Sequence, residues 1–565
     1  MATTFVRQLG AESGVQLNPL VDRSQIIASG STDQSFAIMM RATRGRIDRP
    51  FSVTRSNVFT QLGKGEPIRG TESGDLNEAW VHVVEALNRG AYQAVVKRLV
   101  DDTATNAWCF GDVAGNFWTD GDYDPDSDDP VTNPTALEEG QTEPHAWLFG
   151  LIHHGCFNDG VKLEWWADEN PTGGVNGPQS MVSIRLLDSD GTRIHSFYGS
   201  LDPAARDDYG KSLYLPDVVD SQTDDVIIVI NPEVTAISAP PQGETVFGYG
   251  YVAGKQSWAT SDLLTPFYEG QSAFTRDHYA AAKDQLVYGP LTFAYISSGG
   301  TRSYDMLWVL AELAFETNAQ LRFDVPGSLP VDGAISFVES IMIPDDRAHL
   351  CHAYWSPLRT ADPTGVNPKS IFGVATLNIA LSCVRNGDRN SRGFAPKHYP
   401  IAGMRWPIGR DGVTQIYTPS NQELNALARA KINPCMYEIY SGGGRYVFRD
   451  SLTMANVSNS LRKLIGPIDM ACSIDSSITA AGKDALQLPM AVAIRRLSEY
   501  IENLLTGAES SGWLVPSVDP SMGGAAWRYA VTANAESPYD TIDVSYWVRY
   551  EGTARQIFAT QTITR

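Results

Sequence analysis

Acidic residues are concentrated in one part of this 565-residue chain. Residues 101–250 hold 27 Asp and Glu against 5 Lys and Arg, whereas the rest of the chain has 38 acidic and 39 basic residues. At physiological salt, like charges within about 8 Å of each other repel, so copies of such a segment are costly to pack together. The charge pattern therefore indicates a solvated outer domain, and it argues against nucleic-acid binding by a basic face.

The acidic part of the chain is predicted to be mostly β. It is rich in Gly, Pro, Asn and Asp, and it contains strand-like apolar runs at residues 180–184 and 226–230. Turn residues that separate short β-prone runs are typical of antiparallel sheets. We expect an acidic, mostly β outer insertion over residues 101–285.

The residues on either side of the insertion alternate between strand and helix patterns. The predicted elements are strands at residues 35–40, 94–100, 291–296 and 321–325, a helix that Asp75 caps and Gly90 ends, and a helix at residues 304–318. Alternation of this kind predicts an α/β domain. We assign residues 25–100 and 286–406 to it.

The last part of the chain is predicted to form a further domain between extended arms. The predicted elements are helices at residues 422–430, 457–465 and 485–505 and strands at residues 526–533, 542–550 and 554–564. Residues 1–24 show no sustained period and read as an N-terminal arm. The predicted C-terminal domain covers residues 407–553, and residues 554–565 form a C-terminal arm strand.

Composition excludes several classes of protein. No apolar run reaches the ~18 residues that a membrane span needs, and the first residues lack the pattern of a secretory signal. We therefore expect no membrane insertion. The cysteines are far apart and include no C-x-x-C pair; they are Cys109, Cys156, Cys351, Cys383, Cys435 and Cys472. Such cysteines are usually buried and reduced, with a disulfide or redox role as the alternative.

Three stretches resemble ligand-binding motifs only superficially. The acidic run at residues 120–129 lacks the Gly and Glu of an EF-hand calcium loop, because Pro125 and Val131 stand at those positions. His153, His154 and Cys156 lack the spacing of a zinc site. Residues 442–445 lack a phosphate-binding pattern and read as a tight connection between two strands. We predict no metal and no cofactor.

One fragment leaves an enzyme class open. Residues 164–169 combine two Trp with acidic residues. Most glycoside hydrolases use a pair of carboxylates for catalysis. Any acidic domain offers such pairs by chance, and no motif of another catalytic class occurs. We predict no catalytic residue, and a carbohydrate-active or glycan-binding protein is the alternative from another class.

Four stretches occur in an order that is similar to a known family. They are residues 35–63 after an arm, with Arg49-Pro50-Phe51-Ser52-Val53-Thr54; a helix and strand over residues 80–98; residues 353–357, 374–375 and 391–396; and residues 424–433, 443–445 and 448–452. In this order they resemble the contractile tail sheath family of myophages, pyocin-type particles and related injection machines. The family's "W-G-x-R-T" phrase reads Val447-Phe448-Arg449-Asp450-Ser451 here, and residues 101–285 match nothing in the family.

The resemblance implies a structural protein and a particular α+β multidomain fold. That fold has an α/β inner C-terminal domain with extended terminal arms, an α/β middle domain and a mostly β outer insertion. In the family, subunits stack as six-fold rings around a tail tube. The sheath then contracts and drives the tube through the host envelope, because the contracted lattice has the lower free energy.

The resemblance also implies partners and a location. The expected partners are further copies in hexameric rings, the tail tube protein, and baseplate and tail terminator proteins. The expected location is the virion tail, after assembly in the host cytoplasm. The sheath of a non-phage contractile injection system is the alternative within this class.

Two sets of residues are candidates for contacts in such an assembly. Short β-prone pieces at the chain ends leave edge hydrogen bonds unmet in a monomer and predict strand addition between subunits, with frayed termini as the alternative. These subunit-linking candidates are Val6, Leu9, Ile557, Phe558 and Ile563. The family's use of helices and charge against the tube gives Arg462, Lys463, Arg495 and Arg496 as tube-facing candidates, with solvated or intra-domain charges as the alternative.

Overall fold

The computed structural model describes residues 32–561 with a set of gaps. The gaps are 43, 64, 66–71, 100–106, 113–116, 120–144, 152–161, 169–180, 188–190, 201, 224–225, 231–242, 247–250, 253–254, 257–273, 362–369 and 559. The chain divides into two compact units. We call Gln34–Val384 with Ile401–Ile465 the sheet unit, and Met1–Asp33 with Arg385–Pro400 and Gly466–Arg565 the helix-pair unit.

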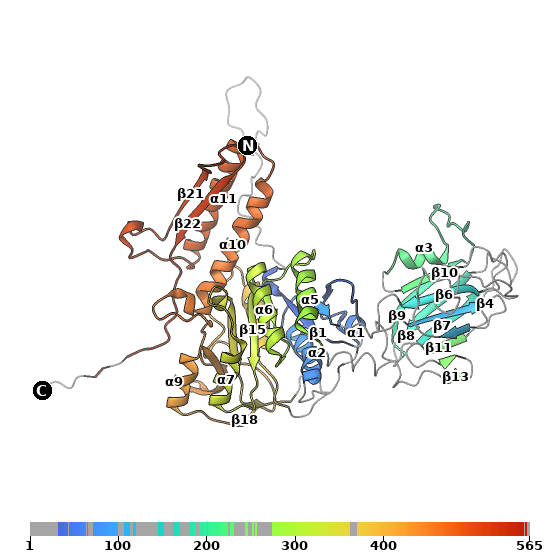
Figure 1. Cartoon of the computed structure of the whole chain (residues 1–565), viewed down its shortest axis with the longest axis horizontal. Coiled ribbons are helices and arrows are strands. Elements are labelled where there is room, and N and C mark those ends of the chain that lie inside the picture. Colours follow the sequence, from blue (N-terminus) through green and yellow to red (C-terminus); the bar gives the residue numbers. More distant parts are fainter. Residues whose placement is uncertain are drawn as a thin grey trace, which may run out of the picture. The chain divides into compact units, whose positions relative to one another are not determined.

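An eight-stranded sheet is the main element of the sheet unit (Figure 1). The order is β2-β3-β1-β14-β15-β16-β19-β20; the six inner strands are parallel, and β2 and β20 are antiparallel edge strands. The bounds are β1 (Ser35–Met40), β2 (Phe51–Val53), β3 (Gln93–Arg98), β14 (Tyr295–Ser297), β15 (Gln320–Val325), β16 (Cys351–Trp355), β19 (Ile432–Tyr440) and β20 (Gly443–Phe448).

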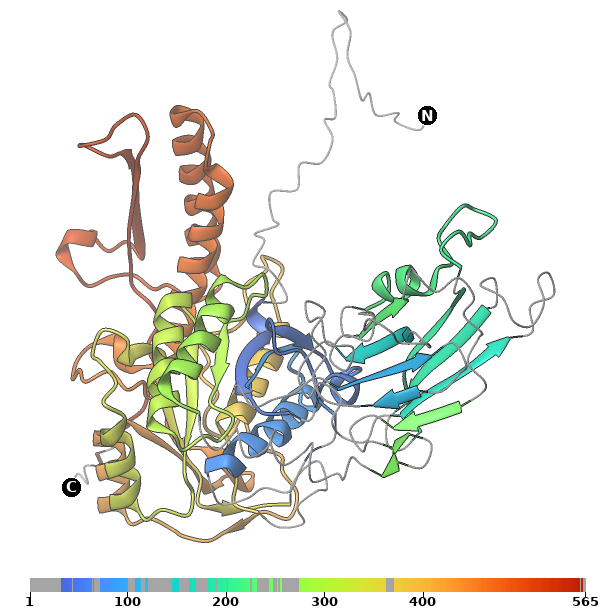
Figure 2. The same cartoon turned by 45° about the vertical axis from the view of Figure 1, so that its right-hand side comes forward.

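Helices connect the parallel strands, as parallel pairing requires. They are α1 (Val58–Leu62), α2 (Glu72–Asn88), α5 (Arg276–Tyr288), α6 (Tyr304–Thr317), α7 (Val331–Ile341), α8 (Ala375–Gly387) and α9 (Asn421–Arg429), with 3-10 turns η1 (Thr32–Gln34), η3 (Ala348–Leu350) and η4 (Leu461–Lys463). Alternate residues Phe36, Ile38 and Met40 of β1 share a core with α2 and α8. Helices α6 and α7 pack against β15, and α5 packs on α6 (green in Figure 2). Strands β1 and β15 are buried along their whole length. Burial on both faces explains the continuous apolar run of β1. In β15, buried polar residues alternate with Leu321, Phe323 and Val325.

The insertion is mostly β, as the sequence predicts. A four-stranded sheet has the order β10 (Val226–Ile230), β6 (His145–Leu151), β4 (Ala107–Asp112), β5 (Phe117–Thr119). A six-stranded sheet has the order β13 (Lys255–Gln256), β12 (Tyr251–Val252), β11 (Gly243–Val246), β7 (Lys162–Asp168), β8 (Met181–Leu187), β9 (Arg193–Ser200). All neighbouring strands in both sheets are antiparallel, and the short helix α3 (Leu215–Asp220) follows β9.

The helix-pair unit contains two long helices and a β-hairpin. Its elements are α10 (Ile465–Ala485), α11 (Met490–Ser510), the 3-10 turn η5 (Pro520–Met522), β21 (Trp527–Ala533) and β22 (Ile542–Val548). Together the two units have the predicted α+β character, with separate α/β and mostly β parts.

Several predicted elements were misplaced. The helix predicted at residues 457–465 is only the turn η4, and α10 begins at Ile465, where the predicted helix ends. Pro467 fits the first turn of a helix but not its interior, so it marks a helix start. Helix α2 begins at Glu72, so Asp75 is not its cap. The strand predicted at residues 291–296 is shorter, because β14 begins at Tyr295.

Toward the C-terminus, the two compact units divide the chain after Ile465, whereas the sequence predicts a division at residue 407. Arg385–Pro400, which the sequence assigns to the α/β domain, also belongs to the helix-pair unit. The C-terminal division differs because β19 pairs with β16 and β20 pairs with β19, so both strands belong to the eight-stranded sheet. The connection between β19 and β20 is tight, but it is shorter than predicted: residues 443–445, predicted as part of the connection, belong to β20. Tyr440 pairs with Gly443, whose φ of 106° favours glycine. Strands β17 (Leu358–Arg359) and β18 (Thr414–Gln415) form a small separate pair.

Four cysteines are buried and form no disulfide with one another, as predicted; they are Cys351, Cys383, Cys435 and Cys472. Burial raises the pKa of Cys351 and of Cys435 to about 12, so neither thiol is reactive at neutral pH. The side chains of Cys109 and Cys156, the acidic run at 120–129, and His153 and His154 lie outside the described residues.

Candidate assembly surface

The helix pair of the C-terminal part is held by an apolar core. Residues spaced four apart on α10, namely Met470, Ile474 and Ile478, meet Ile501 and Leu505 of α11 in one buried cluster. Helix α10 otherwise contains many Ser, Asp and Gly residues, which are weak helix formers, so this packing is needed to stabilise it. The pair therefore forms a rigid base for the elements that follow it.

One face of the hairpin β21–β22 packs on this helix pair. Burial alternates along β22, with Ile542, Val544, Tyr546 and Val548 half-buried and the residues between them exposed. The Tyr546 hydroxyl donates a hydrogen bond to Asp475 of α10. On the other strand, Trp527 Nε1 donates to Glu509 of α11 over 2.7 Å. Both strands are thus attached to helices, β22 to α10 and β21 to α11.

The outer edges of this hairpin are open in the described part of the chain. The sheet has only two strands, β21 and β22, which pair with each other from Trp527↔Val548 to Ala533↔Ile542. Beyond the end of β22, Leu514 forms a single bridge with Tyr550. Unpaired backbone groups on such edges can accept a strand from another chain. A two-stranded sheet is also marginally stable alone, so added strands would stabilise it.

The C-terminal candidates are exposed in the single chain. Residues 551–558 follow β22 and form no helix or strand, so the strand predicted from residue 554 is absent over these residues. Ile557 is 87% exposed and Phe558 is 89% exposed. Val6, Leu9 and Ile563 lie outside the described residues. Two large apolar side chains with nothing to cover them are what a segment that binds a partner presents.

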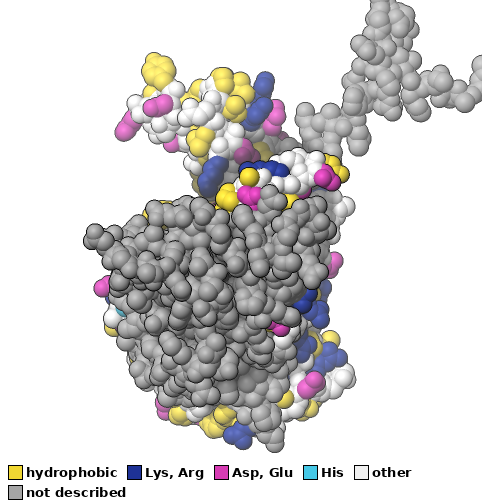
Figure 3. All heavy atoms as spheres, turned by 90° about the vertical axis from the view of Figure 1, so that its right-hand side faces the viewer, with side chains coloured by type: hydrophobic (Ala, Val, Ile, Leu, Met, Phe, Trp, Pro, Cys, Tyr) yellow, Lys and Arg dark blue, Asp and Glu magenta, His cyan; other side chains and the backbone are white. Residues whose placement is uncertain are grey.

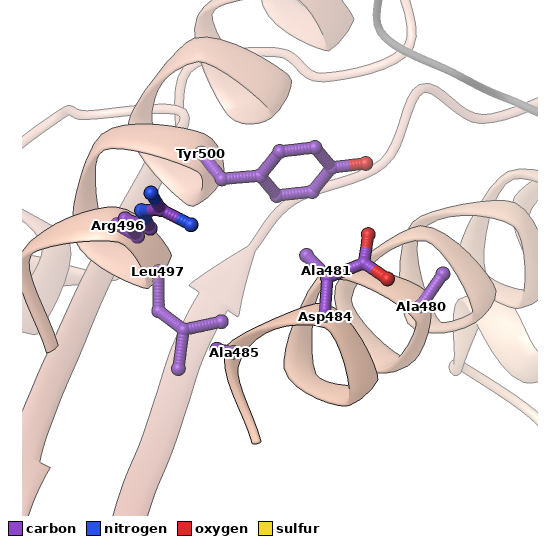
Figure 4. A pocket seen from close by; sticks show the side chains of 7 residues that line it. All are labelled: Ala480, Ala481, Asp484, Ala485, Arg496, Leu497 and Tyr500. Atoms are coloured by element: carbon purple, nitrogen blue, oxygen red, sulfur yellow. The ribbon is translucent and has the colours of Figure 1, made fainter. Parts of the chain in front are cut away.

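A groove of about 360 Å³ lies between α10 and α11 (Figure 4). Its floor is apolar, and Arg496 and Tyr500 of α11 face Asp484 of α10 across it. Neither Arg496 nor Asp484 forms an ion pair with any residue that the structure describes. The residues that line the groove are Ala480, Ala481, Asp484, Ala485, Arg496, Leu497 and Tyr500. Of the tube-facing candidates, Arg496 therefore lines a concave surface, and Arg495 is exposed beside it.

The other two candidates lie elsewhere. Arg462 and Lys463 belong to the turn η4 of the sheet unit, not to a helix. The Arg462 guanidinium hydrogen-bonds His349 Nδ1 over 3.1 Å, and Lys463 donates to the Ser458 carbonyl. These contacts favour an intra-domain role for both side chains, and sequence reasoning could not separate them from Arg495 and Arg496.

A buried charge cluster lies at the carboxyl end of β15 in the sheet unit. Asp324 accepts hydrogen bonds from the backbone N–H groups of Val374 and Ala375 over 2.7 and 2.8 Å, and thus caps α8 from outside the helix. His82 of α2 bonds Glu78 over 3.1 Å. This edge of a parallel sheet often binds ligands. Here its charged side chains bind one another and the backbone.

The charge cluster makes stability depend on pH. Burial by itself lowers the pKa of His82, but the hydrogen bond to Glu78 and the charges of Glu78 and Asp324 raise it above 6.5, against a smaller opposing effect of Arg410. A raised folded-state pKa gives stability that is complete below the unfolded value and is lost as the pH rises through the folded value. We expect the free energy of unfolding to fall above pH 6.5, by at most about 1.4 kcal/mol per pH unit.

Urea unfolding between about pH 6 and pH 7.5 tests this expectation. Above that range the buried Lys97, whose pKa burial lowers to about 8, contributes an opposite trend. His82→Gln should flatten the decline, because it removes the titrating group. An equal slope in wild type and variant would show that His82 does not carry the effect.

No group of three or more His, Cys, Asp or Glu side chains that could hold a metal occurs among the described residues. In the same part of the chain, no helix is long and apolar enough to span a membrane. On the face in Figure 3, described basic and acidic side chains are interspersed. Glu164 lies on β7 opposite Arg185, and the side chains of its neighbours in the 164–169 fragment are not described.

Comparison with known proteins found similar solved structures only. No protein-family model and no curated protein sequence matches the chain. The sheath tail protein from Desulfitobacterium hafniense is similar over 95% of this chain and 100% of its own, with 12% identity and a TM-score of 0.45. A chain of the contracted anti-feeding prophage (AFP) baseplate is similar over 98% of both chains, with 10% identity and a TM-score of 0.46.

A third similar structure is the sheath complex of an extracellular contractile injection system, PVC, in its contracted state. It is similar over 50% of this chain and 74% of its own, with 14% identity and a TM-score of 0.40. The chain is thus similar to sheath and baseplate structures of contractile systems.

Proposed function

We propose that this chain is the structural subunit of a contractile sheath and not an enzyme. The observation that supports it best is the hairpin β21–β22, which packs on the helix pair and has no further strand on either edge in the described part of the chain. A C-terminal segment with exposed Ile557 and Phe558 follows directly. Each chain thus has a sheet edge that can accept a strand and a terminal segment that can supply one. Each copy can therefore bind the next copy, and repetition of this contact makes a polymer.

The terminal arms supply the added strands in this proposal. A strand that pairs with an edge of β21 or β22 satisfies the backbone groups that the single chain leaves open. Its alternate side chains would then be covered by the helix pair or by neighbouring strands. We propose Val6 and Leu9 at one end, and Ile557, Phe558 and Ile563 at the other, as the residues so covered.

The finer function follows the resemblance of the sequence. The polymer would stack as six-fold rings around a tail tube, with the acidic insertion outermost, and would contract to drive the tube through a host envelope. Its further partners would be baseplate and tail terminator proteins, in a phage tail assembled in the host cytoplasm. A non-phage contractile injection system is the alternative for the same architecture.

Negative-stain microscopy of the purified full chain tests the proposal directly. Tubes or stacked rings are the expected result. Discrete particles at high protein concentration, together with binding to an oligosaccharide array, would instead favour the glycan-binding alternative.

We propose the groove between α10 and α11 as the tube contact, with Arg496 as its basic residue and Arg495 beside it. A single exposed pair contributes under about 1 kcal/mol, but the contact repeats in every copy. Arg496→Glu is expected to abolish co-sedimentation with tube protein while sheath-only polymers still form. Lys483→Glu is the matched control, because it reverses an exposed charge on α10 outside the groove.

The pair Arg462 and Lys463 provides a second comparison. If their charge reversal weakens polymers of the sheath alone and leaves tube binding unchanged, they belong to contacts within or between subunits. Normal tube binding by Arg496→Glu would contradict the assignment of the groove.

A further inference from the structure

Partly buried charges hold the start of the described chain within the helix-pair unit. Asp33 Oδ1 receives a hydrogen bond from Lys397 Nζ over 3.1 Å, and its Oδ2 receives one from Arg389 over 3.2 Å. Asn386 donates to the Asp33 backbone carbonyl over 2.8 Å. Asp33 is therefore held through both its carboxylate and its backbone.

The same lysine connects Asp33 to helix α10. Lys397 Nζ lies 3.3 Å from Asp469 Oδ1, and Arg385 binds the other oxygen of that carboxylate. The side chains of Lys397 and Arg385 are 1% exposed and that of Asp469 is 2% exposed. Water thus screens these pairs little, and removal of one partner leaves the other charged and buried.

Segment 390–397, which supplies Lys397, is itself held firmly. The Trp513 indole donates to the Ala395 carbonyl over 2.8 Å, and its ring meets Phe394 edge to face with centroids 5.0 Å apart. The Asn390 side chain donates to Ser511. Lys397 is therefore presented to Asp33 and Asp469 from a fixed backbone.

The position of the cluster along the chain suggests its role. Asp33 lies between the predicted N-terminal arm, residues 1–24, and strand β1, which begins two residues after it. Strand β1 is an inner strand of the eight-stranded sheet, paired with β3 and β14 and wholly buried. Tension on the N-terminal arm would act on β1 through the backbone unless the chain were held at a residue that precedes β1.

We propose that Asp33, Arg385, Arg389, Lys397 and Asp469 form a clasp that holds the root of the N-terminal arm on α10. The clasp transfers tension from a neighbouring copy into the helix pair and keeps it from strand β1. This role rests on the proposed function, because it requires the arm to bind another copy. All five side chains belong to the helix-pair unit.

The test compares four full-length chains: wild type, Asp33→Asn, Asp346→Asn and Leu427→Ala. Asp33→Asn keeps the shape of the side chain and removes its charge. Asp346→Asn removes an exposed carboxylate that bonds Arg347 over 3.2 Å, and is the matched control. Leu427→Ala destabilises the sheet unit at a fully buried residue far from the clasp in sequence, and controls for general loss of stability.

The first measurement is hydrogen exchange of the unassembled chains. Because charge-assisted hydrogen bonds are lost, amides of residues 32–35 should exchange roughly tenfold faster in Asp33→Asn and at the wild-type rate in Asp346→Asn. Unchanged exchange in Asp33→Asn would overturn the clasp.

The second measurement is the guanidinium concentration at which polymers dissociate, with a chain that lacks residues 1–20 as reference. Asp33→Asn polymers should dissociate at a lower guanidinium concentration than Leu427→Ala polymers. This order is expected although unassembled Asp33→Asn is more stable than unassembled Leu427→Ala. Wild-type resistance of Asp33→Asn, while the truncated chain forms no polymer, overturns the clasp and leaves the proposed function standing. Normal polymers from the truncated chain overturn the role of the N-terminal arm, and the clasp with it.

Discussion

A chain with Ile557→Asp and Phe558→Asp is expected to fold normally and to form no tubes. Both side chains are nearly 90% exposed in the single chain, so the substitutions cost little in the unassembled state. In the proposed polymer, the same side chains are covered by a neighbouring copy. Burial of an unpaired carboxylate there costs several kcal/mol per copy, and every subunit contact carries the cost.

Electron microscopy and circular dichroism of this double variant measure assembly and folding separately. Val518→Asp is the matched control, because Val518 is 85% exposed in the same unit and lies outside the arm. Deletion of residues 554–565 or of residues 1–20 should have the same effect as the double variant. Tubes of normal length from the double variant or from the chain without residues 554–565 would contradict strand addition by the C-terminal arm. Tubes of normal length from the chain without residues 1–20 would contradict strand addition by the N-terminal arm.

Arg410→Met is expected to lower the free energy of unfolding by about 3–5 kcal/mol, the largest effect on stability that the structure predicts. Arg410 binds both oxygens of Glu85, over 2.7 and 2.6 Å, and both side chains are 1% exposed. Arg410 also donates to the Gly373 carbonyl over 2.7 Å. Methionine fills similar space but leaves the Glu85 carboxylate buried without its cation.

A double-mutant cycle separates this penalty from the loss of packing. Arg410→Met with Glu85→Leu should recover most of the lost stability, because no buried charge then remains. Arg449→Met removes the half-exposed pair with Glu438, and should cost under about 1 kcal/mol in urea unfolding. If Arg410→Met costs no more than Arg449→Met, the buried pair is not important for stability.

Some parts of the fold were determined locally and could be predicted from the sequence. Residues 35–40 are all apolar or small, as a strand covered on both faces requires, and they form β1. Helix α6 has capping residues at both ends of its own sequence. Ser303 accepts a hydrogen bond from the Met306 N–H at the start, and Asn318 ends the helix in the left-handed conformation. The mostly β insertion likewise follows from its turn residues and short apolar runs.

Other parts were decided only by contacts between distant residues. Helix α10 is poor in strong helix formers and is fixed by core packing, so its sequence gave no clear signal and a helix was predicted in the wrong place. The C-terminal boundary moved because β19 finds its partner β16 far back in the chain. The charges of Arg462 and Arg496 look alike in sequence, yet one bonds His349 and the other lines a groove.

The assembly surface shows the same division most clearly. Sequence patterns located the two strands of the C-terminal hairpin, because alternation of apolar residues is a local property. They could not show that, among the described strands, none pairs with an outer edge of that hairpin, or that Asp33 binds Lys397, 364 positions away. Strand order and buried ion pairs depend on which distant segments meet, and only the folded chain brings those segments together.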